Sequence, residues 1–441
     1  MSIKFVLAVL ASNFLNSFFA KRFVTISLTS TFLSETPIRR ISFTTPAAER
    51  AQITQQAIVR YDASDNAALL AQTQAAIDAD KTDVIHDLLA HLAQRMIDLN
   101  KQKQAEVRRF LGWLEARLKI RPNKDGAAGI DSLTGKSILQ NYLGDYQKGE
   151  NEQPWREFFY RLHQNRNRFA VSLSDIDGEI EREYERSLAA LLPVKRELAR
   201  TDTLIDKIVY RLYGLTDAEI ELIERPQYEQ ALTDAKAQVV ADEQITDDEV
   251  KIDKIAENIL PAAERFFERV EPKPDEDTLD HDLPSWRTLP PAAPTFLLTG
   301  DYNLRTLPEQ MDFSTSIIPY TKAVEVVLDE RIFAPFRAAS GYTESDCKNN
   351  FLKDFMAGKK HLTLGSFMII LSSSKETALR TFIDRQIHDA ANRVFGTNGA
   401  VVLLNDDQMV HIRNKAAHDE VLTRAEAQAI RAWALGILGQ V

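Results

Sequence analysis

Cysteine is almost absent from this chain of 441 residues, which contains only Cys347. A single cysteine excludes a disulfide framework and a zinc site built from several thiolates. It also fits a reducing compartment, so we expect a cytoplasmic protein. Glycine and proline are scarce too, at 16 residues each. Few helix breakers, together with long apolar patterns of period 3.6, predict a mainly α-helical fold.

The sequence also lacks any stretch close to the roughly 20 apolar residues that a membrane-spanning helix needs. The apolar run Phe5–Ala11 is short, Asn13 and Asn16 interrupt the next turns, and the basic pair Lys21-Arg22 comes directly afterwards. A signal peptide is one interpretation of this N-terminus. We favour a helix of the folded protein and expect no membrane partner.

A net positive charge is the third feature that is missing. The formal net charge is −10, with 44% hydrophobic and 27% charged residues, which is typical of a globular protein of two to four domains. An acidic chain does not offer nucleic acid a basic surface all round. Any DNA or RNA contact must therefore come from local basic patches.

Metal and nuclease patterns are weak. His86 and His91 lie five residues apart, which does not place two ligands on one face of a helix, so we predict no metal site. Asp242 followed by Glu249-x-Lys251 formally matches a nuclease carboxylate-and-lysine pattern. That pattern requires a strand, and this run is polar without alternation, so we interpret the match as chance.

The most regular stretch, residues 184–224, predicts a long amphipathic helix, a stop and a short second helix. Gly214 stands where a helix ends in the left-handed conformation. Thr216 and Glu219 have the spacing of a capping box for the next helix. The apolar positions recur at steps of three and four residues: Leu188, Leu191, Leu192, Leu198, Leu204, Ile205, Ile208, Val209 and Leu212.

The amino-acid sequences of several segments resemble the C-terminal part of type IIG and related adenine-specific restriction-modification DNA methyltransferases. The resemblance covers residues 3–225. It rests on VYRLYGLTDAEIELIE (209–224), DLLAHLAQRMIDLNKQKQ (87–104), LTGKSILQNYLGDYQKG (133–149) and the N-terminal helix with its Pro37-Ile38 sequel. The last of these is similar to the end of a TaqI-like target-recognition domain.

That resemblance implies that residues 1–50 are a partial recognition domain, with a small β-containing remnant at 23–32. It also implies that the basic residues Lys21, Arg22, Arg39 and Arg40 face DNA. The alternative is that these four form a solvated rim.

A second basic group lies further along the chain. Arg161, Arg166 and Arg168 form a small cluster with nearby aromatic residues, an arrangement that can hold phosphates and stack bases. It can equally be a solvated helix face. The aromatic neighbours are Phe159, Tyr160 and Phe169.

Methyl transfer has no recognisable residues here. The family's Asn-Pro-Pro-Tyr motif and its glycine-rich loop for S-adenosylmethionine are both missing, and no strand–helix alternation predicts a doubly wound sheet. We therefore expect no cofactor on this chain. S-adenosylmethionine would be bound by a separate methyltransferase or restriction subunit, with this chain the product of a split gene or a truncated one.

The C-terminus carries the sharpest short motif. Arg413, Asn414 and His418 resemble the R-N-x-x-x-H signature of HEPN domains, which are four-helix bundles that often dimerise and cut RNA without a metal. The resemblance implies that Arg413 holds the scissile phosphate, Asn414 orients a reacting group and His418 transfers a proton. Alternatively, Arg413 and His418 only hold two helices together.

These observations predict four segments. Residues 1–50 are the partial recognition domain and 51–225 a helical specificity module. Residues 226–295 are an acidic proline-rich linker, with a helix-prone run at 242–253 and an extended stretch at 270–294. Residues 296–441 are a HEPN-like bundle. The expected function is DNA recognition and scaffolding in a phage-defence restriction-modification system. The alternative is a ribonuclease that acts on RNA as a homodimer; whether the chain is an enzyme stays open.

Overall fold

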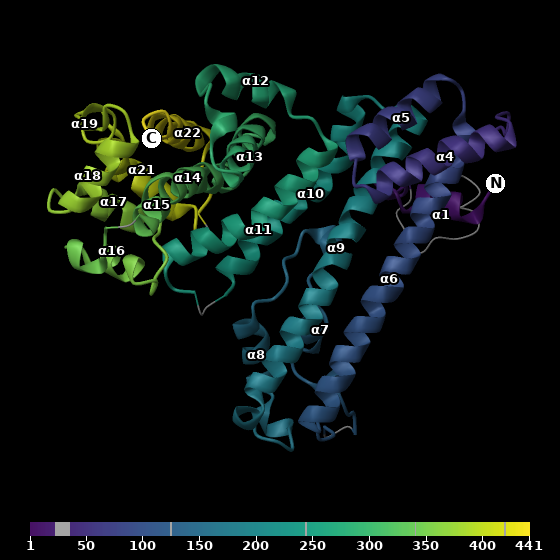
Figure 1. Ribbon diagram of the computed structural model, residues 1–441, viewed down its shortest axis with the longest axis horizontal. Helices are drawn as coiled ribbons and strands as arrows, with labels where there is room; N and C mark the ends of the chain where they lie inside the picture. Colours follow the sequence, from purple (N-terminus) through teal and green to yellow (C-terminus); the bar gives the residue numbers. More distant parts are fainter. Residues whose placement is uncertain (23–35, 124–125, 243–244, 340, 419) are drawn as a thin grey trace. The chain divides into compact units, whose positions relative to one another are not determined.

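The computed structural model of the protein describes residues 1–22, 36–123, 126–242, 245–339, 341–418 and 420–441. Within those ranges every named element is a helix, and the only β pairing is an isolated antiparallel bridge between Ile120 and Phe169 (Figure 1). The prediction of a mainly helical fold is confirmed. The strand expected at 23–32 lies outside the described residues.

The chain forms two compact units. Unit 1 comprises Met1–Pro226 with Glu268–Val270, and unit 2 comprises Gln227–Phe267 with Glu271–Val441. Charge is divided unequally between the two parts of the sequence. Residues 1–226 contain 31 Lys and Arg against 30 Asp and Glu, whereas residues 227–441 contain 23 against 34. The acidic surplus of the protein therefore lies entirely in the second part.

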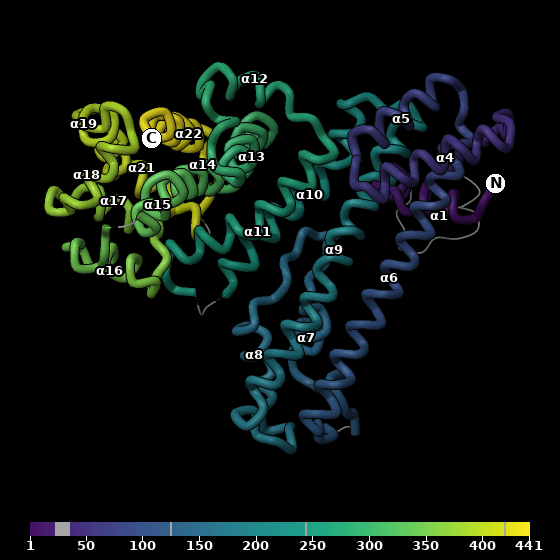
Figure 2. Tube along the Cα trace, viewed as in Figure 1, coloured from purple at the N-terminus to yellow at the C-terminus, as the bar shows by residue number. Residues whose placement is uncertain are grey.

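Unit 1 is built on two long helices, α6 and α9, of 37 residues each, or about 55 Å at 1.5 Å per residue. They pack along one another and can be followed side by side in Figures 1 and 2. The helices of this unit are α1 (Ile3–Ala11), α2 (Asn13–Arg22), α4 (Ala47–Asp62), α5 (Asn66–Asp78), α6 (Thr82–Leu118), α7 (Lys136–Gln140), α8 (Trp155–Gln164), α9 (Asp177–Tyr213) and the start of α10 (Asp217–Val240).

An apolar core lies at each end of this pair. At one end the start of α6 and the end of α9 pack with α1, α4 and α5, around residues such as Phe5, Leu89 and Ile208. At the other end the end of α6 and the start of α9 pack with the α7–α8 region, around Phe110 and Tyr184. Burial of apolar area at both ends stabilises helices that are too long for a single core. The stretch of α6 between the two cores is left polar.

The N-terminal segment 3–23, for which the sequence predicts a single helix, is broken in two within its described part. Ser12 is extended, with ψ 151°, and the backbone N–H of Asn13 donates to the Asp206 carboxylate at 2.8 Å. In the described ranges no single helix has the length and apolar character to cross a membrane. The α1–α2 pair meets that test only when its two helices are taken together across a 66° bend. Phe5, Val9 and Leu15 of this pair are buried in the core of unit 1.

The stop after α9 is confirmed. Gly214 has φ +66°, and Thr216 and Glu219 cap each other's backbone N–H groups at the start of α10. The second helix is longer than expected, because α10 runs for 24 residues to Val240 and passes through Pro226. The residues that prolong it are buried at helical spacing in unit 2: Tyr228, Leu232, Ala235 and Val239.

Unit 2 is organised around α14 (Ser314–Leu328), most of whose residues are buried. This helix packs against α13 (Ala292–Thr306), α17 (Leu364–Ser372), α21 (Asp407–Lys415) and α22 (Arg424–Leu438). The unit's other α-helices are α11 (Asp248–Arg269, with its last turn in unit 1), α12 (Lys273–Asp282), α15 (Ala334–Ala338), α16 (Asn350–Met356), α18 (Thr377–Gln386), α19 (Ala390–Arg393) and α20 (Ala400–Leu404).

The linker predicted for residues 226–295 needs correction, because the region is largely helical and most of it belongs to unit 2. The start of α11 lies in the run 242–253 that was expected to favour helix, whereas the stretch expected to be extended, 270–294, holds α12 and the start of α13. In α11 the residues Ile252, Ile255, Ile259 and Phe266 recur on one face and are buried. That apolar stripe makes α11 part of a folded core rather than of a linker.

Candidate functional site

The C-terminal motif begins on α21, a helix whose first N–H groups are capped by the Asp406 carboxylate. Met409, Ile412 and Arg413 follow at steps of three and four residues and are all buried. The face that buries Met409 and Ile412 therefore also takes the Arg413 guanidinium into the interior. Buried arginine is rare unless it is paired.

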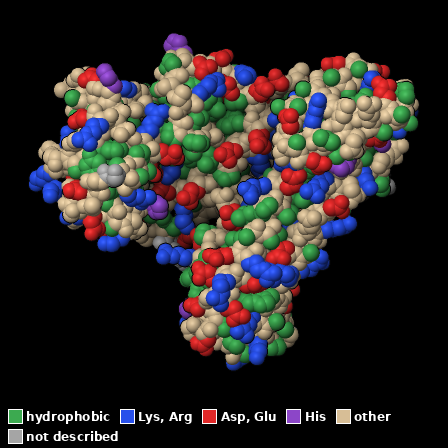
Figure 3. Space-filling view, viewed as in Figure 1, with side chains coloured by type: hydrophobic (Ala, Val, Ile, Leu, Met, Phe, Trp, Pro, Cys, Tyr) green, Lys and Arg blue, Asp and Glu red, His purple; other side chains and the backbone are tan. Residues whose placement is uncertain are grey.

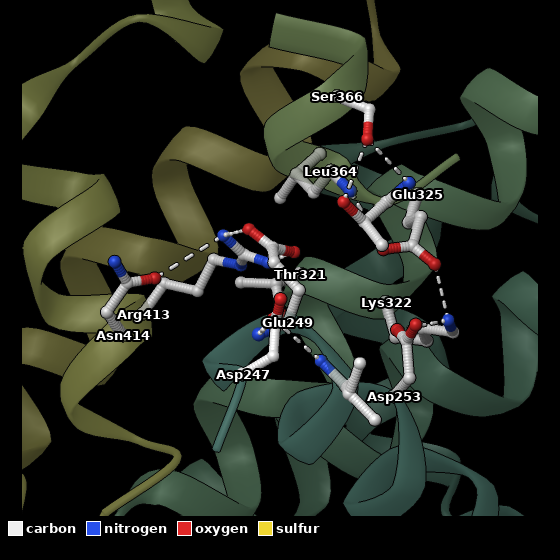
Figure 4. Close-up of polar contacts among 12 residues, drawn as sticks. Asp247, Glu249, Asp253, Thr321, Lys322, Glu325, Leu364, Ser366, Arg413 and Asn414 are labelled. Carbon is white, nitrogen blue, oxygen red and sulfur yellow. Dashed lines mark hydrogen bonds and ion pairs between the residues drawn. The ribbon is translucent and has the colours of Figure 1, made fainter. Parts of the chain in front are cut away.

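Glu249, in the first turn of α11, supplies the partner. Its carboxylate accepts hydrogen bonds from both terminal nitrogens of Arg413, at 2.8 Å between Nη1 and Oε1 and through a second bond from Nη2 to Oε2 (Figure 4). The Arg413 side chain is 3% exposed and that of Glu249 is 26% exposed. A two-point contact of this kind is the geometry in which arginine also binds phosphate.

A glycine makes room for this ion pair. Gly365 is the second residue of α17, and a Cβ atom placed there would lie 2.7 Å from Oε1 of Glu249. No real Cβ contact is that short, so any larger residue would force the carboxylate to shift. Gly365 thus lets α17 approach the carboxylate that holds Arg413.

A second group of charges lies beside the first. The Lys322 ammonium contacts Glu325 on its own helix and Asp253 of α11, the latter at 2.8 Å (Figure 4). The other oxygen of Glu325 accepts the N–H of Leu364, at the positive end of α17. Burial raises the pKa of the Glu325 carboxyl to about 7, although Lys322 and Arg413 oppose the rise.

Asn414 and His418 complete the motif. The side-chain oxygen of Asn414 lies 3.4 Å from Nη1 of Arg413. His418 follows the end of α21, and its Nε2 lies 3.1 Å from the Asp248 carboxylate. The His418 side chain is 45% exposed. Two adjacent acidic residues of α11, Asp248 and Glu249, therefore contact His418 and Arg413 respectively.

This arrangement has a clear chemical limit. Both terminal nitrogens of Arg413 bond to Glu249, and its Nε is buried without a hydrogen-bond partner among the described residues. A phosphate could therefore reach the terminal nitrogens only by displacing Glu249. The His418 imidazole is accessible, and a carboxylate partner can orient such a ring for proton transfer. The structure brings Arg413, Asn414 and His418 into one place, but as a neutralised cation beside an accessible imidazole.

The basic residues predicted near the N-terminus, Lys21, Arg22, Arg39 and Arg40, include exposed side chains and one with a structural contact. Lys21 and Arg22 are exposed in the last turn of α2, and Arg40 is exposed in the segment before α4. Arg39 instead donates to the backbone carbonyl of Leu212. This contact ties the segment to the end of α9, so Arg39 has a structural role whatever its neighbours contact.

The second basic group divides in the same way. Arg168 donates to the carbonyl of Ser132 and to its hydroxyl, which fixes the loop before α7. Arg166 is exposed, and Arg161 lies over the Tyr160 ring. Arg161 and Arg166 belong to the α8 end of unit 1, whereas Lys21 and Arg22 belong to the α1 end. The seven predicted DNA-binding residues therefore do not form one surface.

The space-filling view agrees with that division. On the visible face Lys and Arg side chains are interspersed with Asp and Glu and do not gather into one broad basic area (Figure 3). On this face, a nucleic acid would have to be bound by small groups of cations.

Two sets of residues were not foreseen from the sequence. One is the pair Asp248 and Glu249, of which only Glu249 was considered, as part of a nuclease pattern. The other is a groove of about 490 Å³ between residues 100–108 of α6 and residues 140–147. The sequence indicates this groove only through the polar run NKQKQAE. There the apolar residues that otherwise recur at helical spacing along α6 are interrupted.

Comparison of this chain with protein-family models, with curated proteins and with solved structures finds no match.

Proposed function

We propose that this chain is the DNA-recognition and scaffold part of an adenine-specific restriction-modification system, with methyl transfer performed by a separate subunit that binds S-adenosylmethionine. The link to methyltransferases comes from the sequence segments within residues 3–225. The observation that carries the binding role is the division of charge. Residues 1–226 have nearly equal numbers of acidic and basic side chains, and Lys21, Arg40 and Arg166 among them are exposed. The whole acidic surplus lies in residues 227–441.

The state of Arg413 favours binding over catalysis in the second unit. Its guanidinium is buried and neutralised by Glu249, as in a residue that holds two helices together. A HEPN-like bundle that has kept its fold and serves as an assembly surface agrees with this geometry. Such a bundle would contact a methyltransferase subunit or a second copy of the chain.

DNA binding can be tested by the salt dependence of affinity. The purified chain should bind duplex DNA with an affinity that falls as salt rises, because phosphate contacts release counterions. Replacing Lys21, Arg40 and Arg166 together by alanine should reduce the slope of log affinity against log salt. The expected reduction is about 0.9 for each phosphate that the variant no longer neutralises.

The matched control replaces two paired cations of unit 1. Arg117 is paired with Glu179 and Arg186 with Glu183, so alanine at both positions should leave the slope unchanged. Affinity purification of the chain from its own cells should also recover a methyltransferase subunit. Absence of both DNA binding and that subunit would contradict the proposal.

A metal-independent ribonuclease is the second candidate, and the His418–Asp248 pair favours it. An accessible imidazole beside a carboxylate could take the proton of a ribose 2′-hydroxyl. Cleavage would also require Glu249 to release Arg413, so that the guanidinium can bind the scissile phosphate. Expression of the chain should then cause RNA decay and growth inhibition, and the purified protein should cleave RNA in the presence of a metal chelator.

His418→Ala should abolish that cleavage, whereas His411→Ala should not, because His411 is exposed on α21 outside the motif. Equal RNA decay from the wild type and from His418→Ala would remove the ribonuclease from consideration.

A further inference from the structure

The groove on α6 has the form of a preorganised binding site. Five residues of α6 line it at the spacing of one helical face: Asn100, Lys103, Gln104, Val107 and Arg108. The opposite wall is the segment 140–147, and the volume of about 490 Å³ falls in the range of small-molecule sites. None of the seven predicted DNA-binding residues lines this groove.

The cations of the groove differ from the other cations of α6. Lys103 and Arg108 make no hydrogen bond or ion pair with any residue in the described part of the chain. The remaining basic residues of α6 all have carboxylate partners: Arg95 with Glu197, Lys101 with Asp98, Arg109 with Glu106 and Glu183, and Arg117 with Glu179. Although the chain has a net charge of −10, both of these cations without partners line the same groove.

Carboxamides supply most of the other polar groups in the groove. They are Asn100, Gln104, Gln140, Asn141 and Gln147. A carboxamide can donate and accept hydrogen bonds at once, which is what the edge of a nucleobase requires. Three of these groups already donate within the chain: Asn100 to the Met96 carbonyl, Gln140 to Asp131 and Asn141 to Glu150. Gln104 makes no hydrogen bond with the described residues, so it is the carboxamide most open to a ligand. The carboxylate of the lining, Asp145, already accepts the backbone N–H of Gln147 through one oxygen. Val107, Leu143 and Tyr146 add apolar surface against which a ring can lie.

The wall opposite α6 is held in place from behind. The Lys195 ammonium of α9 donates to the backbone carbonyls of Leu143 and Glu150, both at 2.7 Å. Gly144 has φ +72°, and a Cβ atom there would lie 2.2 Å from the carbonyl oxygen of Asn151. Only glycine permits this close approach, so the segment is fixed before any ligand arrives.

We propose that this groove binds a nucleotide, with its phosphate on Lys103 and Arg108 and its base against the carboxamides. The two cations without partners favour an anion, the open groups of the carboxamides can pair with a ligand's donors and acceptors, and the apolar wall suits a flat ring. Both a free nucleotide and a nucleotide within a single strand have this chemistry. The inference goes beyond the proposed recognition of duplex DNA and does not depend on it.

Titration calorimetry on the full-length protein provides the test. The probes are ATP, AMP, inorganic phosphate and a short single-stranded oligodeoxynucleotide. We expect ATP or the oligonucleotide to bind. Lys103→Glu and Arg108→Glu should each weaken binding by about tenfold or more, because each change removes a charge-assisted contact and adds repulsion. Gln104→Leu should weaken nucleotide binding but leave any phosphate binding unchanged.

Lys101→Glu is the matched control. It makes the same charge reversal on the same helix, two residues away, at a side chain that is 73% exposed and lies outside the groove. It should change affinity by less than about threefold, the range expected for a distant surface charge. Circular dichroism of each variant should show unchanged helix content and melting, since these side chains lie at the surface.

Each outcome decides the question. Binding of ATP that the two groove variants weaken supports a free nucleotide as the ligand. Binding of the oligonucleotide alone, with the same dependence, supports a nucleotide within a strand. The proposal is overturned if no probe binds, if Lys101→Glu weakens binding as much as Lys103→Glu, or if inorganic phosphate binds as well as the nucleotides do.

Discussion

Arg413 in unit 2 and Arg108 in unit 1 are the same type of residue in opposite states. Arg413 is buried and bound at two points by Glu249, whereas Arg108 is exposed at the rim of a groove and has no carboxylate partner among the described residues. The first belongs to a recognisable motif and the second to none. A motif therefore identifies a residue type, while the surroundings decide whether its charge is available to a ligand.

The largest expected effect tests the difference in burial. Glu249→Ala should lower the free energy of unfolding by about 3 kcal/mol, because it leaves the Arg413 guanidinium buried without its partner. Lys103→Ala should change it by less than about 0.5 kcal/mol, because that side chain forms no ion pair within the described ranges. Urea denaturation of the two variants gives both numbers, and similar values for the two would erase the distinction.

The next prediction concerns Glu325 of unit 2 and is tested by measuring the free energy of unfolding over a series of pH values. Its folded pKa of about 7 lies above the ordinary 4.5, so the folded state binds a proton more tightly than the unfolded state. The resulting stability is present below pH 4.5 and is lost as pH rises through 7. Between about pH 5 and pH 8, the unfolding free energy of the wild type should fall by about 2 kcal/mol more than that of Glu325→Gln.

The control for this series is Glu106→Gln in unit 1. The Arg109 guanidinium, opposed by desolvation, lowers the pKa of the Glu106 carboxyl. Its contribution is therefore present above the ordinary pKa and lost only at more acid pH, outside this window. Equal slopes for the wild type and Glu325→Gln would show that the Glu325 carboxyl does not titrate in this range.

Two glycine substitutions should have smaller effects of opposite sign. Gly365→Ala should destabilise the protein by about 1 kcal/mol, because the new methyl group collides with the carboxylate that Arg413 holds. Gly112→Ala should stabilise it by about 0.5–1 kcal/mol, because this residue is inside α6 with no atom near its added Cβ. Thermal melting measures both, and a stabilising Gly365→Ala would mean that the pair around Arg413 has room to move.

Local signals were sufficient for several features. The stop at Gly214 and the capping box of Thr216 and Glu219 depend on neighbouring residues, so the sequence predicted them correctly. The length of α10 and the helices in residues 270–294 were not foreseen. Both depend on apolar residues such as Tyr228 and Leu279 being buried in the folded chain.

The candidate site was predictable only in part. Arg413, Asn414 and His418 could be selected from their spacing, but nothing in that spacing points to Glu249 or Asp248, which lie about 165 residues earlier. The groove on α6 had a visible signal in its run of amides and cations. Its second wall depends on Lys195 and Gly144, which join it only in the folded chain.

Residue types and short spacings were enough to establish the helical class and the end of α9, whereas the boundary that divides the charge between two parts came from the fold. Which cations are neutralised could be seen only after folding. Charge availability depends on burial and on partners from other helices, so Arg413 was matched with a carboxylate while Lys103 and Arg108 were left open to a ligand.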